Sequence, residues 1–237
     1  MIQRVCVFLA AVFLLTAANV HAGLIVDQFN TPDDQSLKVT AKNKHDHSVS
    51  SASSAIDGWR DVSLQLVSSS GQPSYVDVVS DPGELFFTQG TGQAITTVTW
   101  YGADSSSGAA YALNGEDLTS GGDDQFLLTV ADVTGQGIKV SITVYTKDIN
   151  QNVLSSTSVS LIVTAPGVYS LPYSAFSGSA DFSKIDAITL ELDGTNRAGS
   201  DIAITKLATA APEPSTLVLA AIGGMAFLGV GRKWRRA

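Results

Sequence analysis

Three aromatic residues have side chains that could bind a sugar: Trp59, Trp100 and Tyr101. A large flat ring with a polar handle, as in Trp and Tyr, can stack on the apolar face of a sugar and keep its polar edge hydrated. Trp100 and Tyr101 are neighbours, so in a strand one of them points inward and the other outward. Aromatic residues of a β-protein also fill the core, and the sequence leaves both roles open.

The aspartates suggest a second kind of chemistry, the binding of a hard cation. Asp27, Asp33, Asp34 and Asp201 lie in positions typical of loops and strand ends. Carboxylate oxygens are the ligands that Ca²⁺ prefers, so calcium is the candidate cofactor. The sequence has no Asp-x-Asp-x-Asp-Gly loop, and aspartates that cap turns are the alternative interpretation.

The sequence contains no motif typical of an enzyme. His45-Asp46-His47 could bind zinc or copper, but no third ligand follows at a known spacing, which favours a solvated loop. A Gly-x-Ser-x-Gly elbow, a phosphate-binding loop and a dinucleotide-binding glycine pattern are all absent. We therefore expect a protein that is not an enzyme.

The elements that position these residues lie between two targeting segments. The N-terminus has a basic start, an apolar run from Val5 to Ala18, and Val20-His21-Ala22 as a small-residue cleavage site. Residues 1–22 are thus predicted to be a signal peptide. Cleavage after Ala22 would remove the only cysteine, Cys6, and leave a mature chain that begins at Gly23.

The C-terminus predicts a membrane span. Residues 217–231 are uncharged and apolar, and with Ser215 and Thr216 they reach the lower limit of roughly 17 residues for a transmembrane helix. The tail 232–237 is basic, and Lys and Arg resist crossing the membrane, so this end should stay in the cytoplasm. The basic residues are Arg232, Lys233, Arg235 and Arg236.

The linker 209–216 contains Pro212-Glu213-Pro214, followed by the apolar span and the Arg-rich end. This arrangement, with a signal peptide at the other terminus, resembles the PEP-CTERM family of bacterial surface proteins. The resemblance implies processing by an exosortase, a transpeptidase-like membrane enzyme, in a Gram-negative bacterium that produces exopolysaccharide. It also implies export through the inner membrane to the cell surface or beyond, with a membrane anchor until processing.

Charge limits the partners of the middle of the chain. The two ends hold five of the 14 basic and one of the 22 acidic residues, which leaves nine and 21 and a net charge of −12 between residues 23 and 211. Nucleic acid is excluded as a partner, because its binding needs a basic footprint.

Alternating apolar and polar residues predict an all-β fold. Residues 62–66, 138–144, 159–163 and 188–192 each have one apolar face, which is the pattern of a half-buried strand. Turn signals rich in Gly, Pro and Asp separate them. We expect residues 23–208 to form an antiparallel, jelly-roll-like β-sandwich, with a loop at 48–54. Further strands are expected at 24–29, 36–41, 75–79, 84–88, 94–101, 126–130 and 201–207.

Some segments of this region resemble carbohydrate-binding-module jelly rolls of the galactose-binding-like kind. In that family a metal often lies where the first and last strands meet, which implies calcium held by Asp27, Asp33 or Asp34 together with Asp201. Thr205 stands where the last strand of the family often carries an Asp. The matching segments are Asp27-Gln28-Phe29, 171–176, 180–188 and 201–204.

Two functions follow from the sequence. The leading interpretation is an exported, non-enzymatic surface or extracellular-matrix protein. The alternative is a glycan-binding module that acts on the producer's own exopolysaccharide through Trp59, Trp100 and Tyr101. The expected partners are an exosortase, the membrane and a polysaccharide.

Overall fold

The computed structural model describes residues 23–31, 36–68, 74–79, 83–90, 92–101, 113–148, 153–195 and 197–211. The chain divides into one compact unit, Gly23–Ala210, and a second unit made of its two ends. The predicted signal peptide, Pro212-Glu213-Pro214 motif, membrane helix and basic tail lie outside the described residues. No helix in the described part of the chain is long and apolar enough to cross a membrane.

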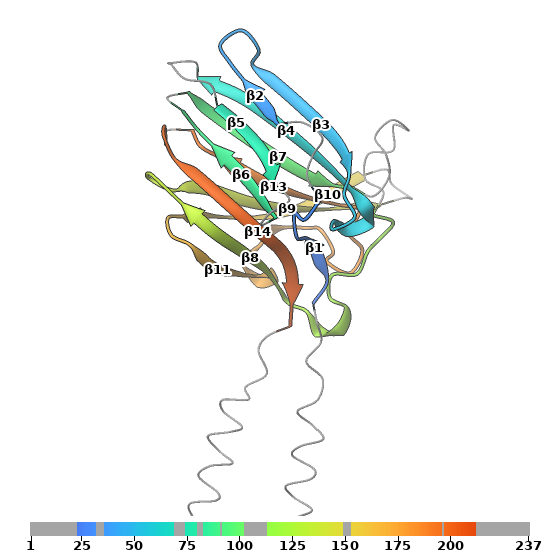
Figure 1. Ribbon diagram of the computed structural model, residues 1–237. Coiled ribbons are helices and arrows are strands. Elements are labelled where there is room, and N and C mark those ends of the chain that lie inside the picture. The colour runs from blue at the N-terminus through green and yellow to red at the C-terminus, as the bar shows by residue number, and fades with distance from the viewer. Residues whose placement is uncertain are drawn as a thin grey trace, which may run out of the picture. The chain divides into compact units, whose positions relative to one another are not determined.

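Two antiparallel β-sheets pack face to face in the compact unit (Figure 1). The first sheet has the strand order β11-β8-β14-β6-β5-β2, with β1 paired to β14, and the second has the order β12-β10-β9-β13-β7-β4-β3. The predicted antiparallel β-sandwich is therefore confirmed.

The first sheet consists of β1 (Ile25–Asp27), β2 (Leu37–Val39), β5 (Ser74–Val79), β6 (Glu84–Thr88), β8 (Gln125–Val133), β11 (Gly167–Pro172) and β14 (Asp201–Ala210). The second consists of β3 (His45–Ser51), β4 (Trp59–Ser68), β7 (Gln93–Trp100), β9 (Ile138–Asp148), β10 (Val153–Val163), β12 (Ser177–Gly178) and β13 (Ala187–Asp193). Short 3₁₀ helices η1 (Ile56–Gly58), η3 (Ser120–Gly122) and η4 (Tyr173–Ala175) lie in the connections.

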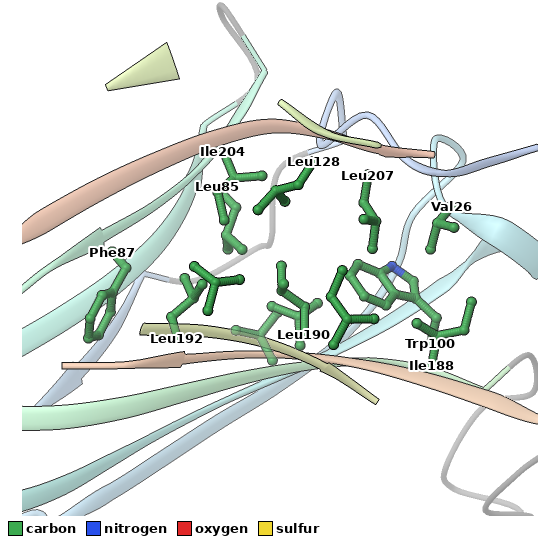
Figure 2. Packing of buried hydrophobic residues seen from close by; sticks show 14 of the residues in the cluster. Val26, Leu85, Phe87, Trp100, Leu128, Ile188, Leu190, Leu192, Ile204 and Leu207 are labelled. Atoms are coloured by element: carbon green, nitrogen blue, oxygen red, sulfur yellow. The ribbon is translucent and has the colours of Figure 1, made fainter. Parts of the chain in front are cut away.

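The core fills the space between the two sheets. Every second residue of β4, β6 and β7 is buried, as period-two strands with one inner face require. Figure 2 shows side chains of the first sheet, such as Leu128 and Ile204, facing Leu190 and Leu192 of the second. Trp100 lies at one end of this layer, beside Ile188 and below Val26 of β1.

Three strands differ from the expectation. β3 covers much of the segment that was predicted to be a loop, and β11 and β12 were not predicted. Six of the seven residues of β3 are exposed or only partly buried, and it pairs with β4 at the sheet edge, so its sequence needs no apolar alternation. At the other end, β14 runs to Ala210, so Thr209 and Ala210 of the predicted linker belong to the sandwich.

Candidate functional site

The outer face of the second sheet carries polar side chains in register from β4 to β9. The pairing of β4 with β7, β7 with β13, and β13 with β9 aligns them in rows that cross the strands. One row contains Asp61, Thr99, Thr189 and Thr143, and the next contains Ser63, Thr97, Glu191 and Ser141. All of these side chains are partly exposed, whereas the residues that alternate with them along the strands are buried in the core.

An aromatic row borders these polar rows. Trp59 starts β4, Tyr101 follows β7, and Tyr145 lies in β9 opposite Ala187 of β13. Continuing the register of Asp61 with Thr99 by two residues places Trp59 beside Tyr101. Trp59 and Tyr145 are partly exposed, whereas Tyr101 is only 9% exposed. We call the polar rows and the aromatic row together the outer face.

Asp61 is fixed between two side chains of this face. The Tyr101 hydroxyl donates a hydrogen bond to its Oδ2 at 2.9 Å, and His47 Nε2 lies 2.7 Å from its Oδ1. Tyr101 is therefore a positioning residue that holds the carboxylate of Asp61. The sequence did not predict this contact of His47 with Asp61. The residues around His47 are typical of a polar loop, whereas in the structure they form β3.

Trp100 points in the opposite direction and cannot contact a glycan. Its side chain is fully buried, and its Nε1 donates a hydrogen bond to Asp27 Oδ2 at 2.9 Å. The ring also packs 6.3 Å from that of Phe29, measured between centroids. The prediction of a glycan contact was therefore wrong for Trp100, because in β7 the inward position falls on it and the outward position on Tyr101.

Asp27 is the centre of a buried polar network. Its Oδ2 accepts a second hydrogen bond from Arg60 Nη1 at 2.9 Å, and both side chains of this ion pair are fully buried. Its Oδ1 accepts hydrogen bonds from Phe29 N at 2.7 Å and from the Ser54 hydroxyl at 3.1 Å. Four donors thus occupy the carboxylate of Asp27. Because one of them is the buried guanidinium group of Arg60, Asp27 serves as its counter-ion and is not a calcium ligand.

The structure also separates Asp27 from Asp201. Asp27 pairs with Leu207 near the end of β14, whereas Asp201 starts that strand, so the two residues are about 20 Å apart along it. Asp201 accepts hydrogen bonds from Gln89 N at 3.1 Å and from the Thr134 hydroxyl at 3.0 Å. Asp27 and Asp201 therefore do not share an ion.

The remaining calcium candidates, Asp33 and Asp34, lie outside the described residues. Within the described ranges, no group of three or more His, Cys, Asp or Glu side chains could hold a metal ion. A role of Asp33 and Asp34 in calcium binding stays a prediction.

Acidic residues gather near the Trp59 end of the outer face. Asp57 precedes Trp59 by two residues, in η1, with a left-handed backbone (φ 55°). Burial, followed by the negative charges of Asp57 and Asp117, raises the pKa of Glu116. This end of the face thus carries negative charge close to Trp59.

Tyr145 is the member of the outer face that the sequence analysis missed. In residues 138–144 of β9, every second residue is apolar and faces the core, and Lys139, Ser141 and Thr143 face outward. Tyr145 is the next residue of this outward set. Extending the alternation by one step would have found it.

The C-terminus matches a known sorting signal. Residues 210–236 match the model of the PEP-CTERM protein-sorting motif, which confirms the motif predicted around Pro212-Glu213-Pro214. No curated protein sequence matches the chain.

Solved structures similar to the chain include two carbohydrate-binding modules. One is the family 11 module of a cellulosomal cellulase of Clostridium thermocellum, with 14% identity and a TM-score of 0.40 over 81% of this chain and 97% of that chain. Another is a family 30 module, with 12% identity and a TM-score of 0.42 over 81% of this chain and 90% of that chain. These neighbours are of the kind that the resemblance in the sequence named.

Proposed function

We propose that the protein is an exported, non-enzymatic surface or matrix protein whose sandwich binds a polysaccharide outside the cell. The sorting motif at residues 210–236 supports export and delivery to the surface. Binding to the producer's own exopolysaccharide is the part of the proposal that depends on the outer face. An exosortase and the membrane are the partners proposed for the C-terminus.

The observation that carries the proposal is the combination of aromatic and hydroxyl side chains on one sheet face. Trp59 and Tyr145 offer ring surface for stacking, and the Thr rows beside them offer donors and acceptors for sugar hydroxyls. Asp61 is pre-oriented by Tyr101 and His47, so binding would cost little ordering of this side chain. A sheet face of this composition, with its polar rows running across the strands, suits an extended chain that lies across the strands.

Charge narrows the class of glycan. Asp61, Glu191 and Asp193 lie on the outer face, and Lys139 lies 3.7 Å from Asp193. With a net charge of −12 between residues 23 and 211, the domain repels polyanions at low salt. The proposed ligand is therefore a neutral or amino-bearing polysaccharide and not one rich in uronic acids.

The carboxylates of this face are better suited to binding than to catalysis. Asp61 is held by Tyr101 and His47, and Asp193 accepts hydrogen bonds from the backbone and hydroxyl of Thr195 at 2.9 and 2.5 Å. Side chains fixed in this way orient a ligand, whereas a glycosidase needs a carboxylic acid free to give up its proton.

Affinity for purified exopolysaccharide of the producing bacterium tests the proposal. Trp59→Ala and Tyr145→Ala should each weaken binding at least about tenfold, which corresponds to ~1.4 kcal/mol. The matched control is Phe86→Ala, which removes an aromatic side chain from β6, where it alternates with the buried Leu85 and Phe87 and so faces away from the core. Wild-type affinity in both outer-face variants, or an equal loss in the control, would contradict a binding site on this face.

A further inference from the structure

The buried carboxylate of Asp123 lies next to the first and the last residues of the sandwich. Asp123 precedes β8 and is only 4% exposed. The Thr209 hydroxyl of β14 donates a hydrogen bond to its Oδ2, but none of the described residues offers a hydrogen bond to its Oδ1. A buried carboxylate oxygen without a donor costs free energy, so this atom calls for a partner with a proton to donate.

The surroundings of Asp123 hold further negative charge. Burial, followed by the charges of Asp123, Asp124 and Asp117, raises the pKa of Tyr173. The Tyr173 hydroxyl donates its hydrogen bond to Leu118 O at 3.1 Å, so it does not supply the missing donor to Asp123 Oδ1. The partner that this region lacks is therefore a cation.

The first residues of the predicted mature chain lie beside the same carboxylate. Leu24 N donates to the Thr209 hydroxyl at 2.8 Å, and Thr209 N donates to Leu24 O at 2.7 Å. The Thr209 hydroxyl thus links Leu24 to Asp123. The nitrogen of Gly23 comes one residue before the amide that begins this link.

Gly23 packs closely on β14. A Cβ atom at this position would lie 1.8 Å from Thr209 O and 3.1 Å from Ala210 Cα, so a side chain cannot be accommodated there. Asp124 N donates to Ala210 O at 3.0 Å, which brings the Asp123-Asp124 segment to the same two residues of β14. Gly23 and Asp123 are therefore held against one short stretch of strand.

We propose that the α-ammonium group of Gly23, once the signal peptide is removed, binds Asp123 and supplies the missing donor to Oδ1. Hydrolysis of the Ala22–Gly23 peptide bond consumes one water: Ala22 leaves as a carboxylate, and the amine of Gly23 takes up a proton. The product has three N–H donors and a full positive charge in place of one amide. Removal of the leader thus completes a buried ion pair and stabilises the sandwich after export, independently of any glycan.

The pKa of the α-amine is the direct readout. The protein is exported through its own signal peptide, its N-terminus is verified by sequencing, and the rate of acylation of the α-amine is followed against pH by peptide mass spectrometry. A free α-amine has a pKa of about 7.7–8.0. Pairing with Asp123 should raise it by about one unit, which slows acylation about tenfold at neutral pH.

Two substitutions make this measurement specific. Asp123→Asn should return the pKa of the α-amine to its usual range, whereas Asp124→Asn, which removes an exposed charge next to it, should leave the pKa raised. The titratable groups near the site are Asp117, Asp124 and Tyr173, and the Asp124 variant controls for their general field. Equal values in the wild type and in Asp123→Asn would overturn the proposal.

A chain with one serine inserted between Ala22 and Gly23 gives a second readout that does not alter Asp123. The insertion moves the ammonium group about 3.8 Å along the chain and leaves the packing of Gly23 unchanged. Its melting temperature should fall below that of the wild type, and its α-amine pKa should be normal. A raised pKa in this variant, or a dependence of the wild-type melting curve on calcium that Asp123→Asn abolishes, would assign another partner to Asp123.

Discussion

Arg60 shows how one buried charge determines the position of a strand. Its Nη1 binds Asp27 of β1, its Nη2 binds Thr31 O, and its Cζ lies 5.3 Å from the centre of the Phe29 ring. Together with Trp100, it connects β1 of the first sheet to β4 and β7 of the second. Because β1 is only three residues long and ends in this network, its position depends on these side chains as well as on backbone pairing with β14.

Arg60→Met should destabilise the domain by about 3–5 kcal/mol, because it leaves the buried charge of Asp27 without its counter-ion. Asp27→Asn should have a similar effect on Arg60. The control is Lys139→Met, which removes a partly exposed ion pair with Asp193 and should cost less than about 1 kcal/mol. Denaturant unfolding measures each difference, and a loss for Arg60→Met no larger than that of the control would show that the pair adds little.

The sequence predicted part of the site at the scale of residues. Alternation in β7 required Trp100 and Tyr101 to face opposite sides, but it did not say which of the two faces outward. The assignment of Asp27 failed because its partners, Arg60 and Trp100, are 33 and 73 residues away along the chain. Only the pairing of strands brings such residues together, and no local pattern records it.

At the scale of elements, the strands found from sequence are those with one buried face. β4, β9 and β13 alternate apolar and polar residues because they lie inside the second sheet. β3 escaped prediction because an edge strand with a single buried residue, Ser50, needs no apolar side. The positions missed by sequence analysis are therefore the sheet edges, where hydrogen bonding to one neighbour is enough.

The stability of the domain should depend on pH through Glu116, which lies in the connection before η3. Its backbone pairs with Ile185 in both directions, at 2.9 and 2.8 Å, so a change of side chain leaves the pairing intact. The pKa of Glu116 is raised in the folded state, so ionisation of this residue lowers stability as pH rises from its unfolded pKa through its folded pKa. Above the folded pKa this loss of stability is complete, and below the unfolded pKa it is absent.

Glu116→Gln should therefore raise the melting temperature at pH 7, by less than about 4 °C because the side chain is partly exposed. Near pH 4 the variant and the wild type should melt together. Scanning calorimetry at both pH values measures the difference. Asp181 has a pKa shift of the opposite sign, because hydrogen bonds from the Ser183 hydroxyl and backbone lower the pKa of Asp181. Asp181→Asn is therefore the opposite case to Glu116→Gln. A gain for Glu116→Gln that is the same at both pH values would mean that charge is not its cause.

For the whole molecule, the important feature is where the chain enters and leaves the sandwich. β1 pairs with the last residues of β14, so the start and the end of the compact unit lie side by side (Figure 1). The two predicted processing points, after Ala22 and near Pro212, are attached to neighbouring strands of one sheet. The outer face, in contrast, belongs to the other sheet, so processing and glycan binding would use different parts of the domain.

The basic tail should determine how the protein is delivered. Lys and Arg resist transfer across the membrane, so Arg232, Lys233, Arg235 and Arg236 should hold the C-terminus in the cytoplasm while the sandwich faces outward. Deleting residues 232–236 should therefore reduce the amount of protein at the cell surface, as measured by protease accessibility on whole cells. Replacing the four basic residues by Gln is the matched variant, because it keeps the length of the tail.

Processing adds a second test of the same end of the chain. If an exosortase cuts near Pro212-Glu213-Pro214, the intact mass of the surface protein should correspond to a chain that begins at Gly23 and lacks Trp234. The proposed cut removes the membrane span, so the mature domain would keep β14 intact to Ala210 and lose only residues beyond the sandwich. A surface protein whose mass still includes Trp234 would show that the span is retained as an anchor. In that case the proposed exosortase step would be wrong, whereas the orientation set by the four basic residues would still hold.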